Sequence, residues 1–197
     1  PAWTAEGNQV SGYFASSVAS AGDVNGDGYS DVIVGAVDYS NPEALEGRAF
    51  VYHGSPTGLA ASAAWTGECN VAYAHFGWSV SSAGDVNGDG YSDVIVGAPQ
   101  SDNGQADEGF AFVYYGSAAG LAASPGWTIE SNQAFAYFGY SVATAGDVNG
   151  DGYSDVIVGA LFYDNGQTDE GRAYVYLGSA SGLAATPAWT AEADQRA

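Results

Sequence analysis

The sequence predicts an all-β fold assembled from three copies of one four-stranded antiparallel unit. A segment of 16 residues, Ala-Gly-Asp-Val-Asn-Gly-Asp-Gly-Tyr-Ser-Asp-Val-Ile-Val-Gly-Ala, occurs unchanged at 21–36, 83–98 and 145–160. Successive copies are therefore 62 residues apart. Tryptophan recurs with the same spacing, at Trp3, Trp65, Trp127 and Trp189. A fixed period of this length indicates one structural unit stacked several times, and no stretch shows a useful helical periodicity.

Each unit is predicted to contain four strands, described here for the third copy. Residues 140–145 form a short strand before an acidic loop, and 155–160 follow with a continuous apolar run, typical of a strand buried on both faces. Residues 172–177 mix β-branched and aromatic side chains. The tryptophan segment 185–191 is the outer strand, where Pro187 is tolerated because an edge needs fewer donors. Four short antiparallel strands per repeat describe a propeller blade, whereas the coils of the alternative, a solenoid, are usually shorter.

The whole chain is thus predicted to be one propeller-type unit of three blades, at about 7–68, 69–130 and 131–192. The segment Pro-Ala-Trp-Thr-Ala-Glu occurs at 1–6 and again at 187–192. The sequence therefore holds three complete units and one redundant copy of the outer strand.

The charge composition excludes several classes of partner. The chain has a formal charge of −20, three arginines and no lysine, so electrostatic binding to nucleic acid or to an anionic membrane is excluded. No stretch is long and apolar enough for membrane insertion, and none has the pattern of a signal peptide. Nine of the 23 acidic residues lie in the three repeated segments, which indicates bound cations rather than a uniformly repulsive surface.

Each repeated segment has the oxygen pattern of a calcium loop. In the first copy Asp23, Asn25 and Asp27 alternate with other residues, Tyr29 offers its backbone carbonyl, and Asp31 closes the sphere. These loop positions 1, 3, 5, 7 and 9, with glycine at position 6, match the start of an EF-hand loop. The predicted metal-binding residues are Asp23, Asn25, Asp27, Tyr29, Asp31, Asp85, Asn87, Asp89, Tyr91, Asp93, Asp147, Asn149, Asp151, Tyr153 and Asp155.

The match to an EF-hand ends at position 12, where valine replaces the bidentate glutamate, and strands rather than helices flank the loop. The alternative is an Asx-rich turn without an ion. Three identical copies, and the mutual repulsion of the carboxylates, favour the ion. Hard oxygen ligands in a flexible loop select Ca²⁺ over Mg²⁺. We expect about three Ca²⁺ per chain, each bound with a Kd on the order of 10⁻⁴ to 10⁻³ M or somewhat tighter.

Nothing in the sequence predicts catalysis. Neither His53 nor His75 recurs in the other copies, and no Ser-His-Asp arrangement is supported. Cys69 is the only cysteine, and small residues occupy the equivalent positions of the other units, so we expect it to be a small residue in a loop. The chain is therefore predicted not to be an enzyme.

The motifs that flank the acidic loops resemble those of the FG-GAP repeat family, the blades of the integrin α-subunit propeller and of microbial surface proteins. The pairs Phe76-Gly77 and Phe138-Gly139 precede the loops, and Gly97-Ala98-Pro99 follows the second one. The first unit departs from the pattern with Phe14-Ala15, and the first and third lack the proline. The resemblance covers essentially the whole chain.

The resemblance implies a calcium-binding β-propeller, extracellular or at the cell surface, that serves recognition, adhesion or scaffolding. Its ions lie in the loops that join the first and second strands of a blade. The loops of the opposite face differ between units, at 37–46, 99–108 and 161–170, so a protein or glycan ligand is expected there. Two alternatives stay open: a purely structural self-assembling fragment that binds only calcium, and an accessory domain of a larger surface enzyme.

Three blades are too few for a ring, because propellers usually close with about four to eight. An open wedge exposes two apolar blade faces, which favours association. We expect a homodimer that completes six blades, with one of the duplicated outer-strand segments displaced at each junction. Another oligomer and a monomeric wedge are the alternatives.

Overall fold

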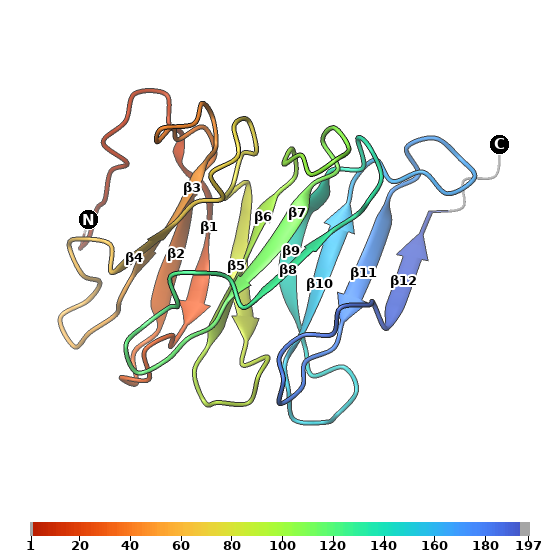
Figure 1. Cartoon of the computed structure of the whole chain (residues 1–197). Coiled ribbons are helices and arrows are strands. Elements are labelled where there is room, and N and C mark those ends of the chain that lie inside the picture. Colours follow the sequence, from red (N-terminus) through yellow and green to blue (C-terminus); the bar gives the residue numbers. More distant parts are fainter. Residues whose placement is uncertain (1, 194–197) are drawn as a thin grey trace.

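The computed structural model describes residues 2–193, in which the strands form three separate four-stranded antiparallel sheets (Figure 1). Blade 1 contains β1 (Phe14–Gly22), β2 (Asp31–Ala36), β3 (Arg48–Tyr52) and β4 (Trp65–Gly67). Blade 2 contains β5 (Ser79–Gly84), β6 (Asp93–Ala98), β7 (Phe110–Tyr114) and β8 (Trp127–Glu130). Blade 3 contains β9 (Phe138–Gly146), β10 (Asp155–Ala160), β11 (Arg172–Tyr176) and β12 (Trp189–Glu192).

Every sheet is a meander in which each strand pairs with its sequence neighbour, so the predicted all-β fold and four-stranded units are confirmed. The bounds of β10 are as predicted. The predicted strand at 140–145 is too short, because the Phe-Gly pair before it also joins the sheet through Phe138, which pairs with Ala160. The predicted outer strand at 185–191 starts too early: pairing with β11 begins at Trp189, after Pro187, which has no amide hydrogen to donate.

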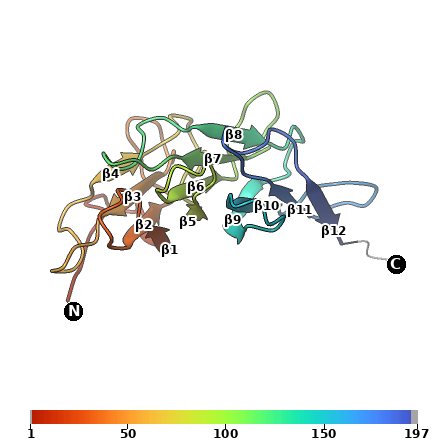
Figure 2. The same cartoon turned by 90° about the horizontal axis from the view of Figure 1, so that it is seen from below.

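The three blades lie side by side in sequence order, with blade 2 in the middle. Along this stack the first strand β5 of blade 2 contacts β1 on one side and β9 on the other. Viewed along the strands, the fourth strands β4, β8 and β12 lie on the outside (Figure 2). The arrangement is therefore propeller-blade-like, with inner strands gathered and outer strands spread.

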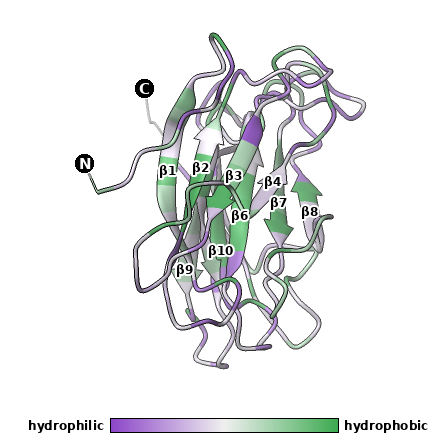
Figure 3. Ribbon diagram, turned by 90° about the vertical axis from the view of Figure 1, so that its left-hand side faces the viewer, coloured by the Kyte–Doolittle hydropathy of each residue, from purple (hydrophilic) through white to green (hydrophobic). Residues whose placement is uncertain are grey.

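The hydrophobic core lies between blades rather than inside any one of them, because a single sheet cannot bury its own faces. One cluster joins Val24 and Ile33 of blade 1 to Phe76 of blade 2, and another joins Val86 to Phe138 of blade 3. Both phenylalanines are fully buried. Figure 3 views the molecule from the blade 1 side. In this view the strand β6 of blade 2 is green, hence hydrophobic, over most of its length.

The periodic tryptophans fasten each blade to the next. The indole Nε1 of Trp65 donates to the carbonyl of Ala122 at 3.0 Å, and its ring packs edge-on against Tyr114 with centroids 4.8 Å apart. Trp127 repeats the hydrogen bond to blade 3, at 3.1 Å. Trp3 makes the same bond to Ala60 of blade 1, at 2.9 Å, although it belongs to no strand. The amino-terminal segment therefore covers blade 1 in the way that an outer strand covers the following blade.

The loops separate into two sets at opposite ends of the strands, as the sequence predicts. The β1–β2, β5–β6 and β9–β10 loops, which carry the repeated acidic motif, lie at the lower end in Figure 1, together with the loops before the fourth strands. The long β2–β3, β6–β7 and β10–β11 loops lie at the upper end. Among residues 2–193 there is no helix of the length and apolarity needed to cross a membrane.

Glu46, at the upper end of blade 1, is a buried carboxylate that lacks a partner. The side chain is fully buried, and neither carboxylate oxygen accepts a hydrogen bond within residues 2–193. Burial, assisted by the nearby Glu68 carboxylate, raises the pKa of Glu46 from 4.5 to about 7. The folded protein therefore binds a proton at Glu46 that the unfolded chain releases at lower pH.

Replacing Glu46 by glutamine is expected to stabilise the protein at pH 8. Because the folded-state pKa is raised, stability is lost as pH increases from about 4.5 through 7, and the neutral amide removes that loss. We expect a gain on the order of 2 kcal/mol at pH 8 and little change at pH 5, measured by urea unfolding. Glu6→Gln, which removes the same charge from an exposed position, is the control. Equal effects at the two pH values would contradict this account.

Candidate metal-binding loops

The three acidic loops have one geometry, which begins with the aspartate at position 1. Asp23 Oδ1 accepts hydrogen bonds from the amides of Gly26 (2.7 Å) and Asp27 (3.1 Å), and Oδ2 accepts from the amide of Gly28 (2.8 Å). Asp85 and Asp147 make the corresponding three bonds in their own loops. The hydrogen bonds from these backbone amides, above all the one from Gly152, lower the pKa of Asp147. The first carboxylate thus shapes the turn while its side chain remains at the surface.

Positions 3 and 5 lie in the same turn. Asp27 Oδ1 accepts from the amide of Tyr29 at 2.9 Å, and Asn25 Oδ1 accepts from the amide of Asp27 at 3.1 Å. The Asn25 Nδ2 group donates to Asp27 Oδ2 at 3.1 Å. The other two loops repeat this donation, from Asn87 and from Asn149. The structure thus brings the predicted residues at positions 1, 3 and 5 together in each loop.

The aspartate at position 9 has a different environment. Asp31, Asp93 and Asp155 are fully buried. Asp31 Oδ2 accepts from the amide of Val24 at 2.9 Å, and Oδ1 accepts from the amide of Gly54, beyond β3, at 2.8 Å. This carboxylate therefore joins the acidic loop to the following turn at the same end of the blade.

The sequence predicts the aspartates at position 9 only as metal ligands. In the structure they also join the acidic loop to the turn before the fourth strand. A signal for this role exists in the sequence, because a glycine follows each of these aspartates at a constant distance of 23 residues. The amide of that glycine donates a hydrogen bond to the aspartate Oδ1 each time. Burial raises the pKa of Asp93 to about 7, against the hydrogen bonds from Gly116 and Val86.

The donor chemistry of the loops fits a hard cation. Within residues 2–193 no three His, Cys, Asp or Glu side chains converge on one point, since position 3 is asparagine and position 9 bonds to backbone amides. All side-chain acceptors of the loop are nevertheless oxygens, and a carboxylate oxygen with one hydrogen bond retains further acceptor capacity. Within residues 2–193 no hydrogen bond reaches the carbonyls of Tyr29, Tyr91 and Tyr153, and their ligand role stays a prediction.

The following blade braces the first two loops. The amide of Ser92 donates to the carbonyl of Asp23 at 2.9 Å, and the amide of Ser117 donates to that of Val24 at 3.1 Å. The ring of Tyr91 lies against Gly26, where an added Cβ would be 2.6 Å from Cε1. Blade 3 braces the second loop in the same way, through Ser154, Ser179 and Tyr153. The third loop has no such neighbour within the described residues: a Cβ added at Gly150 would meet nothing within 4 Å.

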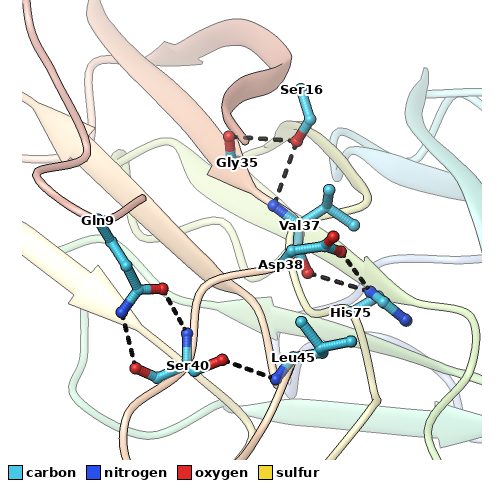
Figure 4. A network of polar contacts seen from close by, with 8 residues as sticks. All are labelled: Gln9, Ser16, Gly35, Val37, Asp38, Ser40, Leu45 and His75. Carbon is cyan, nitrogen blue, oxygen red and sulfur yellow. Dashed lines mark hydrogen bonds and ion pairs between the residues drawn. The ribbon is translucent and has the colours of Figure 1, made fainter. Parts of the chain in front are cut away.

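Side chains from neighbouring segments hold the loops at the opposite end, as Figure 4 shows. Gln9 Nε2 donates to the carbonyl of Ser40 at 2.9 Å, and the amide of Ser40 donates back to Gln9 Oε1 at 2.8 Å. His75 Nδ1 lies 3.0 Å from Asp38 Oδ1, which connects the β2–β3 loop of blade 1 to blade 2. Gln133 repeats the paired glutamine bonds in blade 3, with the backbone of Asp164. The upper loops of blades 1 and 3 therefore differ in sequence, but each is fixed by side-chain hydrogen bonds.

The sequence matches the FG-GAP repeat at 14–51, 76–114 and 138–176, one match in each blade. Integrin alpha-PS2 of Drosophila melanogaster is 35% identical over 80% of this chain and 12% of its own length. Integrin alpha-4 of Xenopus laevis is 35% identical over 82% of the chain and 16% of its own length. Human integrin alpha-7 is 35% identical over 79% of the chain.

The chain thus spans less than a fifth of the length of these relatives. The FG-GAP homologues of integrin α-subunits are a non-catalytic family, in agreement with the prediction that the chain is not an enzyme. The chain belongs to the FG-GAP repeat family, with three integrin-like propeller blades.

Proposed function

We propose that these blades form a non-catalytic, calcium-stabilised recognition or adhesion module, located extracellularly or at the cell surface. The observation that carries the proposal is the identical oxygen-rich loop at the same end of all three blades. Its similarity to integrin α-subunits supports the location and the recognition role.

In this proposal the side chains at positions 1, 3 and 5 of each loop hold the ion, aided by the position 7 carbonyl and the position 9 carboxylate. In the first loop these residues are Asp23, Asn25, Asp27, Tyr29 and Asp31. Bound Ca²⁺ supplies the positive charge that offsets the repulsion between the carboxylates. The position 9 carboxylate transmits the loop shape to the turn before the fourth strand.

The recognition surface in this proposal is the end of the blades opposite the calcium loops. The loops there differ between blades, and the Gln9 and Gln133 bonds fix two of them, so a ligand meets a preformed surface. Its partner is a protein or a glycan. Screening the protein against immobilised glycans and proteins, with calcium present, tests this part of the proposal.

Calorimetric titration tests the metal part. We expect about three Ca²⁺ to bind per chain with a Kd on the order of 10⁻⁴ to 10⁻³ M. Asp89→Asn, which removes an exposed carboxylate of the second loop, is expected to reduce the number to about two. Asp102→Asn removes an equal charge from the opposite end and serves as the control. The absence of calcium-dependent heat at millimolar concentrations would refute the metal sites.

A further inference from the structure

The end of blade 2 opposite the acidic loops contains a buried carboxylate with an unpartnered oxygen. Glu108, near the end of the β6–β7 loop, is fully buried. Its Oε1 accepts hydrogen bonds from the amides of Asn103, at 2.7 Å, and Gln105, at 3.4 Å. Its Oε2 is buried and accepts no hydrogen bond within residues 2–193, and the same is true of the side-chain Oε1 of Gln105. Two buried oxygens of one turn therefore lack a partner.

A second carboxylate adjoins this turn. Asn103 links the two acids, since its backbone amide donates to Glu108 and its side-chain Nδ2 donates to Glu130 Oε2 at 3.0 Å. Glu130 is the last residue of β8, and its other carboxylate oxygen accepts no hydrogen bond from residues 2–193. Burial raises the pKa of Glu108, and the nearby carboxylate of Glu130 raises it further. The turn thus contains negative charge that its own hydrogen bonds do not offset.

Blades 1 and 3 have an arginine at this place, and blade 2 does not. In blade 1 Arg48 donates to the carboxylate of Glu68, the residue equivalent to Glu130. In blade 3 the Nη2 of Arg172 donates to Glu192, again the equivalent residue, at 2.6 Å. The equivalent of these two arginines in blade 2 is Phe110, which is neutral.

Blade 2 also lacks the aromatic ring that supports the guanidinium. The Arg48 Cζ lies 4.3 Å from the centre of the Tyr39 ring, and the Arg172 Cζ lies 4.5 Å from that of Tyr163. The residue at this position of blade 2 is Ser101. Blade 2 therefore keeps the carboxylates of the other blades without the cation that accompanies them.

From this contrast we infer that blade 2 binds a calcium ion where blades 1 and 3 have an arginine. Its protein ligands are Glu108 Oε2, Gln105 Oε1 and the carboxylate of Glu130, and water completes the sphere. All of them are oxygens, as Ca²⁺ prefers, and two carboxylates match its charge. Because blade 2 has a neighbouring blade on both sides, the site does not depend on residues at either end of the chain.

This ion is expected to bind more weakly than those of the acidic loops. The site has two carboxylates, whereas each acidic loop has three, and affinity for Ca²⁺ depends on the number of charged ligands. We expect a Kd on the order of 10⁻³ M or above, so that the loops fill first. A measurement that resolves individual sites is therefore needed.

Nuclear magnetic resonance of the whole chain, labelled with ¹⁵N and titrated with CaCl₂ at constant pH and constant NaCl, provides this resolution. The blade 2 amides, of Asn103 and Gln105, donate to Glu108 and report on the inferred site. The loop amides, of Gly88 and Gly90, donate to Asp85 and report on the second acidic loop. We expect both pairs of signals to shift, with the blade 2 amides saturating at the higher calcium concentration.

Three variants sharpen the test. Phe110→Arg supplies the arginine of the other blades and is expected to abolish the response of the blade 2 amides while the loop amides still respond. Phe110→Leu removes the ring without adding charge and is the matched control, which keeps the response. Glu130→Gln retains an oxygen for Asn103 but removes one charge, and is expected to raise the Kd of this site about tenfold or more. The dispersion of the remaining signals verifies that each variant is folded.

Two results would overturn the inference. Blade 2 amides that shift with pH but not with calcium show that a proton, and not a metal ion, accompanies Glu108. A calcium response that is unchanged in both Phe110→Arg and Glu130→Gln arises from another site. The inference does not rest on the acidic loops: if the loop amides stay unmoved while the blade 2 amides shift, the calcium loops fail and this site stands.

Discussion

Gly97→Ala is expected to destabilise the protein by about 3–5 kcal/mol, a large part of the stability of a typical domain. Gly97 lies in β6, where blade 3 packs against blade 2, and an added Cβ would collide with the carbonyl oxygen of Gly139. A backbone carbonyl cannot rotate away as a side chain can, so the two blades must separate. Urea unfolding, or the temperature of unfolding, measures the loss.

Gly159→Ala is the matched control for this prediction, because Gly159 has the same position in blade 3. There the added Cβ would meet the hydroxyl of Ser141 at 2.5 Å, which can move to another rotamer. We expect a loss below about 1 kcal/mol. Equal losses in the two variants would show that the intrinsic effect of a Gly→Ala change within a strand, and not packing between blades, determines the loss of stability.

Removal of calcium is expected to lower the unfolding temperature by about 8–16 °C relative to a sample with about 10 mM CaCl₂. A ligand that binds only the folded state stabilises it by RT ln(1 + [L]/Kd), which is about 1.4 kcal/mol per site for a Kd of about 1 mM. Three sites together contribute about 4 kcal/mol, and each kcal/mol shifts the midpoint of a chain of this size by about 2–4 °C. Differential scanning calorimetry with calcium or with a chelator measures the shift.

Magnesium at the same concentration is the control, because Mg²⁺ requires a stricter geometry and loses its water reluctantly. It should produce a clearly smaller shift. An unfolding temperature that is the same with calcium and with chelator would contradict the stabilising role of the ion.

The repeat made much of the fold predictable. Three identical segments that contain Val-Ile-Val must occupy equivalent buried strands, and β2, β6 and β10 have identical bounds within the repeat. The start of β12 was harder to predict, because apolar and polar residues do not alternate strictly in the tryptophan segment. Pairing with β11 decides where this strand begins. Strand ends depend on neighbours that are distant in sequence.

The sequence predicted which residues belong to the acidic loops, but not the different structural role that each of them has. Spacing alone groups Asp23, Asn25 and Asp27 in one turn. That Asp31 is buried and bonded to Gly54 depends on how β3 returns to the same end of the blade, which local sequence does not encode. The isolation of Glu46 likewise follows from packing between blades. The recurrence of a Glu-Gly pair at 46, 108 and 170 marks the position as part of the repeat but does not show that the carboxylate is buried.

Each Phe-Gly pair packs on glycines of the preceding blade, and this has a consequence for how such chains can grow. One stretch of 62 residues carries both the glycines that receive the Phe-Gly pair of the next blade and the Phe-Gly pair that packs on the preceding blade. Tandem duplication of that stretch therefore creates a new blade and its fitting seam in a single genetic event, with no compensating substitution elsewhere. Chains of this kind can gain or lose whole blades while each remaining seam keeps its chemistry.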